Sequence, residues 1–203
     1  MKKFNFKNGL ILSSIIRNVK LKKFEIRLFY LYRKEFANVR GLNIKLELLP
    51  CTVQSIDQSE LKSISEKCER YYSEEKMLKM LSKGWECLGL KYKNEIVSLR
   101  WYNFKKCDSK LLPFLLKDNE VYITGAITFN DYRGKNIAPY LSLKMYERLA
   151  YLGRTIFYSI VSFSNTSAIR FHKKIGSDPY RLYLFIELFK KYRIRFPLRQ
   201  YRS

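Results

Sequence analysis

Glycine and proline are scarce in this chain, with 8 and 5 residues among 203. A composition so poor in both excludes a collagen-like repeat and a low-complexity linker. The hydrophobic fraction of 47% is sufficient for a buried core. A chain of this length therefore predicts one domain with an extension.

Histidine is nearly absent, and closely paired cysteines are missing. The chain has one histidine and four cysteines, and no two cysteines have CxxC spacing. A structural zinc site needs four such ligands, usually in short-spaced pairs, so we predict no metal site. The four cysteines are interpreted as reduced thiols in a cytoplasmic protein.

Long apolar runs are missing as well. None approaches the roughly 20 residues that a membrane-spanning helix needs. The apolar stretch GLILSSII at residues 9–16 is short, and no small-residue cleavage site follows it. We therefore predict no signal peptide and a cytoplasmic location, with peripheral contact to the inner face of the membrane left open.

Acidic residues are few: the chain has 18 Asp and Glu residues and 40 Lys and Arg residues, which gives a formal net charge of +22. Such an excess favours acidic partners: nucleic acid, an anionic membrane or a phosphate-bearing small molecule. Charge alone does not choose among these partners. A solvated surface without any partner is equally compatible with it.

Residues 10–37 have the spacing of a basic amphipathic helix. Leu10, Ile11 and Ile15 begin the pattern, and Leu28 and Tyr32 continue it. Such a helix either lies on an anionic membrane or packs on its own domain with a solvated basic face. We predict an extension over residues 1–40 and a single domain over residues 41–203.

The remaining patterns predict an α/β domain with a mixed central sheet. Strands are expected at 41–51, 85–92, 96–104, 121–129, 154–162 and 180–189, and helices from Asp57 or Ser59 to Tyr71 and at 73–83, 135–151 and 165–174. The strands at 121–129 and 154–162 should be parallel neighbours, because a helix joins them. The basic tail after residue 189 is expected to be only partly ordered.

The stretch FNDYRGKNIAPYL, residues 129–141, joins a strand to a helix through a short basic turn. The first amides of a helix have no intrahelical partner and carry partial positive charge. Gly134 lets the backbone approach a ligand closely, and Asn136 tolerates a positive φ. With Arg133 and Lys135 beside them, these amides predict a site for a phosphate or diphosphate.

A second segment, SNTSAIRFHKKIG at residues 164–176, strengthens this prediction. Together the two segments resemble the GNAT (Gcn5-related) N-acetyltransferase superfamily. The acetyl-CoA pattern Q/R-x-x-G-x-G/A is matched at Arg133, Asn136 and Ala138. The pattern N-x-x-A-x-x-F-Y-x-K-x-G-F is matched at Asn165, Ala168, Phe171, His172, Lys174 and Gly176. The resemblance covers about residues 44–190.

The resemblance implies a GNAT-like central sheet with splayed parallel strands, flanked by helices, and acetyl-CoA as co-substrate. It places the pantetheine arm beside residues 127–129 and the pyrophosphate at residues 133–138, while Asn165 contacts the cofactor or braces the strands. The implied cofactor-binding residues are Ile127, Thr128, Phe129, Arg133, Gly134, Lys135, Asn136, Ile137, Ala138 and Asn165.

The resemblance also implies the catalytic residues. Glu120 is placed to accept the amine proton, and His172, which replaces the usual Tyr, would protonate the leaving thiolate as an imidazolium. Tyr180 and Tyr183 are rival acids. Glu120 could instead be a solvated carboxylate, and His172 a packed residue. Two further departures are Asn136 and Ser177, which replace a usual Gly and Phe.

The function predicted from these features is transfer of an acetyl group from acetyl-CoA to a primary amine, such as an amino sugar or another small amine. Trp85, Trp101 and Tyr102 either line the acceptor pocket or belong to the core. Nucleic acid is not needed as a partner, because CoA itself carries a 3′-phosphate. The alternative is a GNAT-fold binding module with little catalysis that uses its basic surface for RNA or an anionic membrane. A homodimer is left open.

Overall fold

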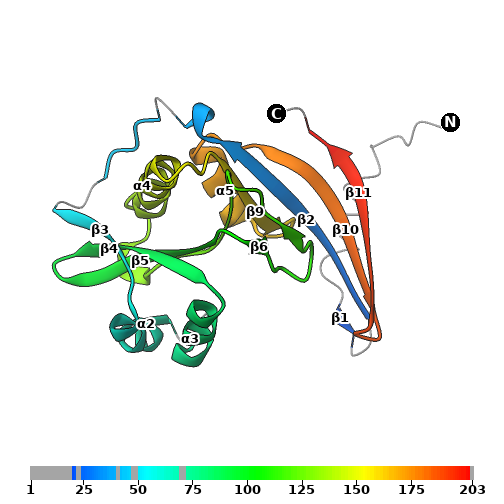
Figure 1. Ribbon diagram of the computed structural model, residues 1–203, viewed down its shortest axis with the longest axis horizontal. Helices are drawn as coiled ribbons and strands as arrows, with labels where there is room; N and C mark the ends of the chain where they lie inside the picture. The colour runs from blue at the N-terminus through cyan, green and yellow to red at the C-terminus, as the bar shows by residue number, and fades with distance from the viewer. Residues whose placement is uncertain (1–19, 22–23, 40–41, 47–49, 69–71, 202–203) are drawn as a thin grey trace.

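One mixed β-sheet runs through the whole molecule in the computed structural model (Figure 1). The structure describes residues 20–21, 24–39, 42–46, 50–68 and 72–201. Within these ranges nine strands share the sheet, and the order of the main path is β11-β10-β2-β9-β8-β5-β4-β3, with β1 paired to β2. Every neighbouring pair is antiparallel except β8 and β9, which are parallel as predicted.

The strands of this sheet are β1 (Lys20–Leu21), β2 (Phe24–Glu35), β3 (Cys51–Ser55), β4 (Trp85–Tyr92), β5 (Glu95–Asn103), β8 (Glu120–Thr128), β9 (Ile156–Ser162), β10 (Pro179–Leu188) and β11 (Tyr192–Gln200). The helices are α2 (Leu61–Cys68), α3 (Glu74–Ser82), α4 (Ile137–Tyr151) and α5 (Thr166–Lys174), with single 3-10 turns η2 (Phe36–Asn38), η3 (Gln58–Glu60) and η4 (Asn130–Tyr132). A separate small hairpin consists of β6 (Lys106–Cys107) and β7 (Phe114–Leu115).

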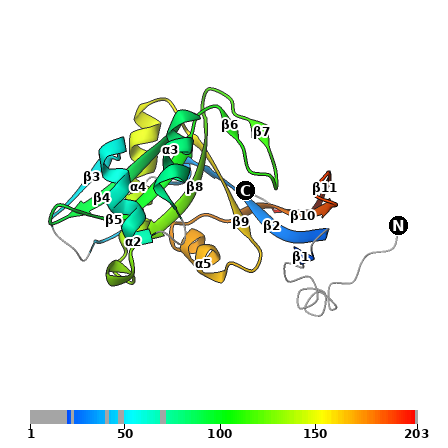
Figure 2. The same cartoon turned by 90° about the horizontal axis from the view of Figure 1, so that it is seen from below.

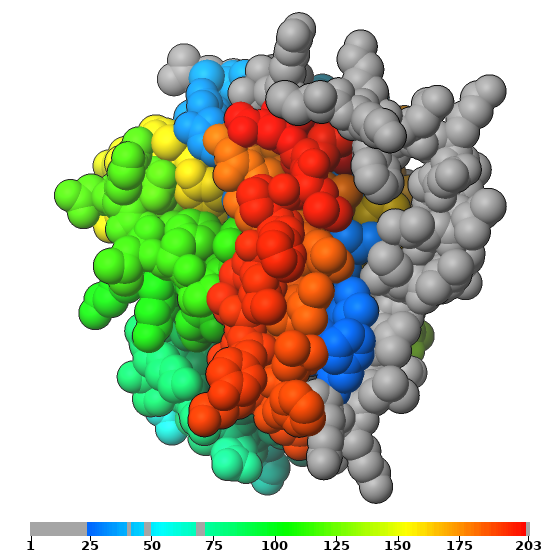
Figure 3. All heavy atoms as spheres, turned by 90° about the vertical axis from the view of Figure 1, so that its right-hand side faces the viewer, coloured from blue at the N-terminus to red at the C-terminus, as the bar shows by residue number. Residues whose placement is uncertain are grey.

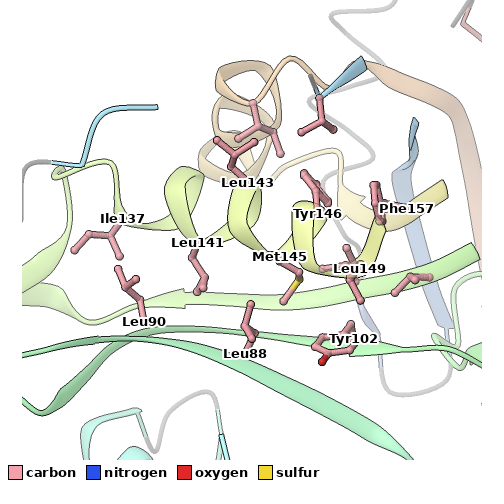
Figure 4. Close-up of a cluster of buried hydrophobic side chains, with 14 of the residues drawn as sticks. Leu88, Leu90, Tyr102, Ile137, Leu141, Leu143, Met145, Tyr146, Leu149 and Phe157 are labelled. Carbon is pink, nitrogen blue, oxygen red and sulfur yellow. The ribbon is translucent and has the colours of Figure 1, made fainter. Parts of the chain in front are cut away.

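Helices cover both faces of the sheet near its middle. Helices α4 and α5 lie on one face, and α2 and α3 lie on the other (Figures 1 and 2). Helix α4 packs its apolar face on β4 and β5, where Leu141 and Met145 meet Leu88 and Tyr102 (Figure 4). All four of these side chains are almost fully buried, so this contact anchors the start of α4 to the sheet.

Local sequence signals placed several elements correctly. Asp57 forms a capping box with Glu60 ahead of α2, and the Ser73 hydroxyl accepts from the amide of Lys76 at the start of α3. The β4–β5 hairpin turns through Lys93 and Asn94, both at positive φ, which matches the right-handed twist of paired strands.

The N-terminal prediction was wrong where it can be checked. Residues 24–35 form strand β2, not a helix, and β2 pairs with β9 on one side and β10 on the other. Positions four apart, such as Leu28 and Tyr32, share a face in a strand as well as in a helix, so their spacing could not distinguish the two. Residues 10–19 of the predicted helix lie outside the described residues.

The predicted domain boundary at residue 40 was therefore also wrong, because β2 lies inside the sheet of the main domain. The first predicted strand was shifted: residues 42–46 have no regular structure, and β3 begins at Cys51. The basic tail forms β11, which pairs with β10 along its whole length. Tertiary pairing, which sequence periodicity does not report, decides all three cases.

Candidate active site

A gap opens in the sheet between β8 and β9. The two strands pair only over Glu120–Tyr122 and Ile156–Tyr158. Beyond that point β8 follows β5 as far as Thr128, while β9 follows β2 as far as Ser162. The facing edges of the two strands therefore lose their ladder partners, which is the splayed arrangement expected from the sequence.

A bulge in β8 lies next to the point where the strands part. The register between β5 and β8 shifts between Leu99 and Trp101, so Gly125 and Ala126 together oppose a single residue. Gly125 has φ +62°, and a Cβ at this position would lie 2.1 Å from the Tyr72 hydroxyl oxygen. Glycine is therefore required, and the bulge bends β8 away from β9.

The turn before α4 has the geometry that the sequence predicted. Gly134 has φ +83° and Asn136 has φ 58°, so both residues adopt the left-handed region. Among the described residues, none provides a hydrogen-bond acceptor for the amides of 134–138. These donors lie at the N-terminus of a 15-residue helix, where unpartnered amides can bind an anion. The side chain of Ile137 is in the core, so it contributes only its amide.

Three cationic side chains surround this turn. The Arg133 Nε donates to the Thr128 carbonyl at 3.1 Å, and the Lys135 Nζ donates to the Asp131 carbonyl at 3.1 Å. The Lys174 Nζ, from α5, donates to the Asn136 side-chain oxygen. Their charges add to the partial charge of the helix end, and each is exposed enough to reach a bound anion.

The other residues implied for the cofactor are partly engaged within the protein. The carbonyl of Ile127 accepts from the Ser98 hydroxyl at 2.7 Å, and the Thr128 hydroxyl lies 3.1 Å from that Ser98 oxygen. The amide of Phe129 donates to the Val97 carbonyl. Asn165 caps α5, where its Oδ1 accepts from the Ala168 amide at 3.0 Å. Asn165 therefore positions α5 at the far edge of the gap.

His172 is buried and uncharged. Its Nε2 lies 3.2 Å from the Ser159 hydroxyl, and its ring stacks on Tyr32 with centroids 3.9 Å apart. Burial, together with the positive charges of Arg100 and Lys34, lowers the pKa of His172 from 6.5 to about 3. The imidazolium acid expected from the sequence is therefore not present near neutral pH.

Glu120 lies at the start of the paired part of β8 and is 8% exposed, so it is not a solvated edge residue. Its Oε2 accepts from the Lys117 amide at 2.9 Å, and its Oε1 accepts from the Tyr158 hydroxyl at 3.1 Å. Burial and the neighbouring Glu120 carboxylate raise the pKa of Tyr158. The carboxylate thus lies two residues before the gap, hydrogen-bonded to a tyrosine on the opposite strand.

A pocket of about 280 Å³ opens on the α2–α3 side of the sheet. Tyr122 and Thr124 reach it from β8, so it adjoins the gap from the face opposite α4. Asp108 is its carboxylate, and the Trp85 Nε1 donates to Asp108 at 3.4 Å. The Lys76 ammonium lies 4.4 Å from the centre of the Tyr72 ring. The pocket is lined by Tyr72, Lys76, Met80, Trp85, Asp108, Ser109, Tyr122 and Thr124.

The sequence anticipated only part of this pocket. Trp85 lines it, whereas Trp101 and Tyr102 are 0% and 1% exposed and belong to the core. Asp108 and Lys76 were missed, because they come from a segment without periodicity and from an exposed helix face. No signal within the sequence connects two such positions. Among the described residues, no group of side chains has the arrangement of a metal site.

Comparison with known proteins gives the class of fold. No family model matches the sequence, and no curated protein sequence matches it. Solved structures with a similar fold include a tandem GNAT protein from the clavulanic acid biosynthesis pathway, with 8% identity and a TM-score of 0.60. A GCN5-related N-acetyltransferase from Sphaerobacter thermophilus has 14% identity and a TM-score of 0.57. The matches cover 92% and 89% of this chain, which spans 60% and 56% of those proteins.

A third similar structure is the ribosomal-protein-S18-alanine N-acetyltransferase from Escherichia coli, with 15% identity and a TM-score of 0.51. That match covers 62% of this chain and 76% of the bacterial enzyme. These proteins share the central mixed sheet flanked by helices. The chain described here therefore has the GNAT fold.

Proposed function

We propose that this protein is an N-acyltransferase that moves an acetyl group from acetyl-CoA to a primary amine. The observation that carries this proposal is the set of unpartnered amides at residues 134–138, placed at the open end of the gap between β8 and β9. A diphosphate offers the negative charge and the acceptor oxygens that such amides bind. The gap beside them leaves unpaired strand edges for an extended, amide-containing arm.

The residues at the turn fit such a group. A Cβ added at Gly134 would meet no atom within 4 Å, so the backbone there faces open space. Arg133, Lys135 and Lys174 supply three positive charges around it. Bound at this turn, the co-substrate would supply the acetyl group. The protein would hold its phosphates and exclude water from the gap.

The amine acceptor is proposed to enter from the opposite face, through the pocket beside Tyr122 and Thr124. The carboxylate of Asp108 attracts an ammonium group, and aromatic walls favour a cation as well. The bound ammonium first loses one proton to solvent and becomes a neutral amine. The amine nitrogen then bonds to the carbonyl carbon, the carbon–sulfur bond breaks, and sulfur leaves with the electron pair. We assign the released nitrogen proton to Glu120, with Tyr158 as its hydrogen-bonded neighbour.

The test uses two substitutions of similar size at one position. Gly134→Asp places a carboxylate beside the phosphates, whereas Gly134→Asn adds the same bulk without charge, and Asn tolerates a positive φ. A unit charge at ~5 Å with an effective dielectric constant of ~20–40 implies CoA binding weaker by roughly 15- to 300-fold for Asp relative to Asn.

Calorimetric titration of CoA into both variants measures this ratio. Gly153→Asp is the matched control, because Gly153 also has a positive φ and open space but lies at the other end of α4. Equal CoA affinity for Gly134→Asp and Gly134→Asn would contradict the proposed phosphate site at this turn. Failure of CoA to raise the unfolding temperature of the unchanged protein would remove the proposed function itself.

A second candidate function is contact with an anionic membrane, and it rests on exposed apolar side chains. Phe189 at the tip of the β10–β11 hairpin is 65% exposed, and Lys190 and Lys191 stand beside it. Along β11, Tyr192, Ile194 and Phe196 alternate with arginines and are 57%, 42% and 45% exposed. Figure 3 shows this strand at the surface beside β10. Among the described helices, none is long and apolar enough to cross a bilayer.

An apolar strand face combined with a net charge of +22 suits an anionic lipid surface. Sedimentation with phosphatidylglycerol vesicles should retain the protein at low salt, and phosphatidylcholine vesicles should not. Phe189→Ser with Ile194→Ser should release it, whereas Leu115→Ser, an exposed leucine on the small hairpin, should not. Equal retention by neutral vesicles, or no retention, would reject membrane contact through this strand.

A further inference from the structure

Arg100 on β5 is a buried cation without a carboxylate partner in the part of the chain that the structure describes. Its side chain is 3% exposed, and it forms no ion pair with the described residues. The Nη1 donates to the Ser142 hydroxyl, the Tyr146 hydroxyl is a second partner, and the Nε has none. Burial lowers the pKa of Arg100, but a guanidinium stays charged in proteins. An unpaired buried charge is costly, so its retention points to an anion that is absent when the site is empty.

The position of Arg100 beside the gap agrees with a role in binding an anion. In the register of β5 and β8, Arg100 faces the bulge at Gly125 and Ala126, where β8 leaves β9. Its guanidinium contacts Ser142 on α4 and lies 5.1 Å from the centre of the Phe171 ring on α5. Because α4 follows β8 and α5 follows β9, this charge lies between the two helices that flank the gap.

Two buried polar atoms at the end of α5 also have no hydrogen-bond partner among the described residues. They are the Nδ1 of His172 and the hydroxyl oxygen of Ser177. The Ser177 amide donates to the His172 carbonyl at 2.9 Å, so both residues belong to the end of α5. His172 adjoins Phe171 and is neutral, so Arg100 provides the permanent positive charge in this group.

We propose that Arg100 binds the thiolate that leaves when the thioester is cleaved. This inference rests on the proposed function, because it requires CoA in the gap. The carbon–sulfur electron pair ends on sulfur, and the guanidinium stabilises that charge until sulfur takes a proton from water. Arg100 thereby stabilises the thiolate electrostatically, whereas the resemblance had implied that an imidazolium of His172 protonates it.

The test measures the thiol of bound CoA without any turnover. A free alkyl thiol such as a cysteine side chain titrates near ~8.5. If Arg100 binds the thiolate, the ultraviolet thiolate absorbance of CoA bound to the unchanged protein should appear at least one pH unit lower. That shift corresponds to about tenfold tighter binding of the thiolate than of the thiol. In Arg100→Met the bound thiol should titrate as it does in solution.

Several comparisons separate this role from a structural one. Desulfo-CoA, which lacks the thiol, should bind Arg100→Met and the unchanged protein equally well. The ligand-free Met variant should unfold at the same temperature as the unchanged protein or higher, since an unpaired buried charge is removed. Arg100→Lys should keep part of the thiol shift. Arg148→Met, on the exposed side of α4, is the control and should change nothing.

Two outcomes would overturn the assignment: an unshifted thiol in the unchanged protein, or an equal shift in Arg100→Met. A ligand-free Met variant that unfolds at a lower temperature, together with weaker desulfo-CoA binding, would make Arg100 a structural residue. None of these results would contradict the proposed function, provided that CoA itself binds to the protein. Absence of any CoA binding would instead reject the proposed function, and this inference with it.

Discussion

The stability of this protein should fall as the pH is lowered from 7 to 5, and the reason is His172. The folded protein holds this ring neutral, with a pKa of about 3, whereas the unfolded chain binds a proton near 6.5. As the pH falls, the unfolded chain therefore takes up the proton first and is stabilised relative to the folded state. From the two pKa values, the free energy of unfolding at pH 5 should be lower by about 2 kcal/mol than at pH 7.

The assay is urea unfolding, followed by tryptophan fluorescence, at half-unit steps between pH 7 and pH 5. His172 is the only histidine in the chain, so no other imidazole contributes in this window. The groups that face the ring are Tyr32 and Lys34 on β2, Arg100 on β5 and Ser159 on β9. The ordinary pKa values of tyrosine, lysine and arginine side chains all lie well above this range.

The control is His172→Phe, which keeps an aromatic ring against Tyr32 and removes the titrating group. Its stability should be nearly independent of pH in this range, whatever its absolute value. A flat profile for the unchanged protein would show that His172 is protonated or solvent-accessible when folded. A slope that persists in the Phe variant would assign the effect to carboxylates instead.

Three further outcomes are expected. Gly125→Ala should lower the free energy of unfolding in urea by ~2–3 kcal/mol, because the added Cβ would lie 2.1 Å from the Tyr72 hydroxyl. Gly153→Ala, where the added Cβ meets open space, should lower it by only ~1 kcal/mol. Glu120→Gln should lower kcat by ~100-fold or more, while CoA should still raise the unfolding temperature of the variant. An unchanged kcat would show that Glu120 does not accept the proton. Asp108→Asn should raise the KM for the amine about tenfold and leave the KM for acetyl-CoA alone; equal changes in both would contradict the pocket assignment.

Local patterns were reliable wherever neighbouring residues decide the structure. The turn at residues 133–136, the caps at Asp57 and Ser73, and the parallel pairing of β8 with β9 follow from glycine, capping residues and the strand–helix–strand order. The set of free amide donors at this turn follows in the same way, because it depends on the backbone of one continuous segment.

The N-terminal strand, the pocket beside Tyr122 and Thr124 and the charge of His172 depended on contacts between distant parts of the chain. Strand β2 exists because a position between β9 and β10 needs hydrogen-bonding partners on both sides, and residues 24–35 supply them. Asp108, from the segment that follows β5, and Thr124, on β8, line the same pocket only in the folded chain.

The sequence by itself determined a basic chain with a left-handed turn between a strand and a helix, since each of these is a property of composition or of adjacent residues. Only the tertiary structure decided which charges remain inside. Burial among β2, β5 and α5 neutralises His172 and leaves Arg100 charged, because the cost of removing a cation from water depends on its surroundings and on its own proton affinity.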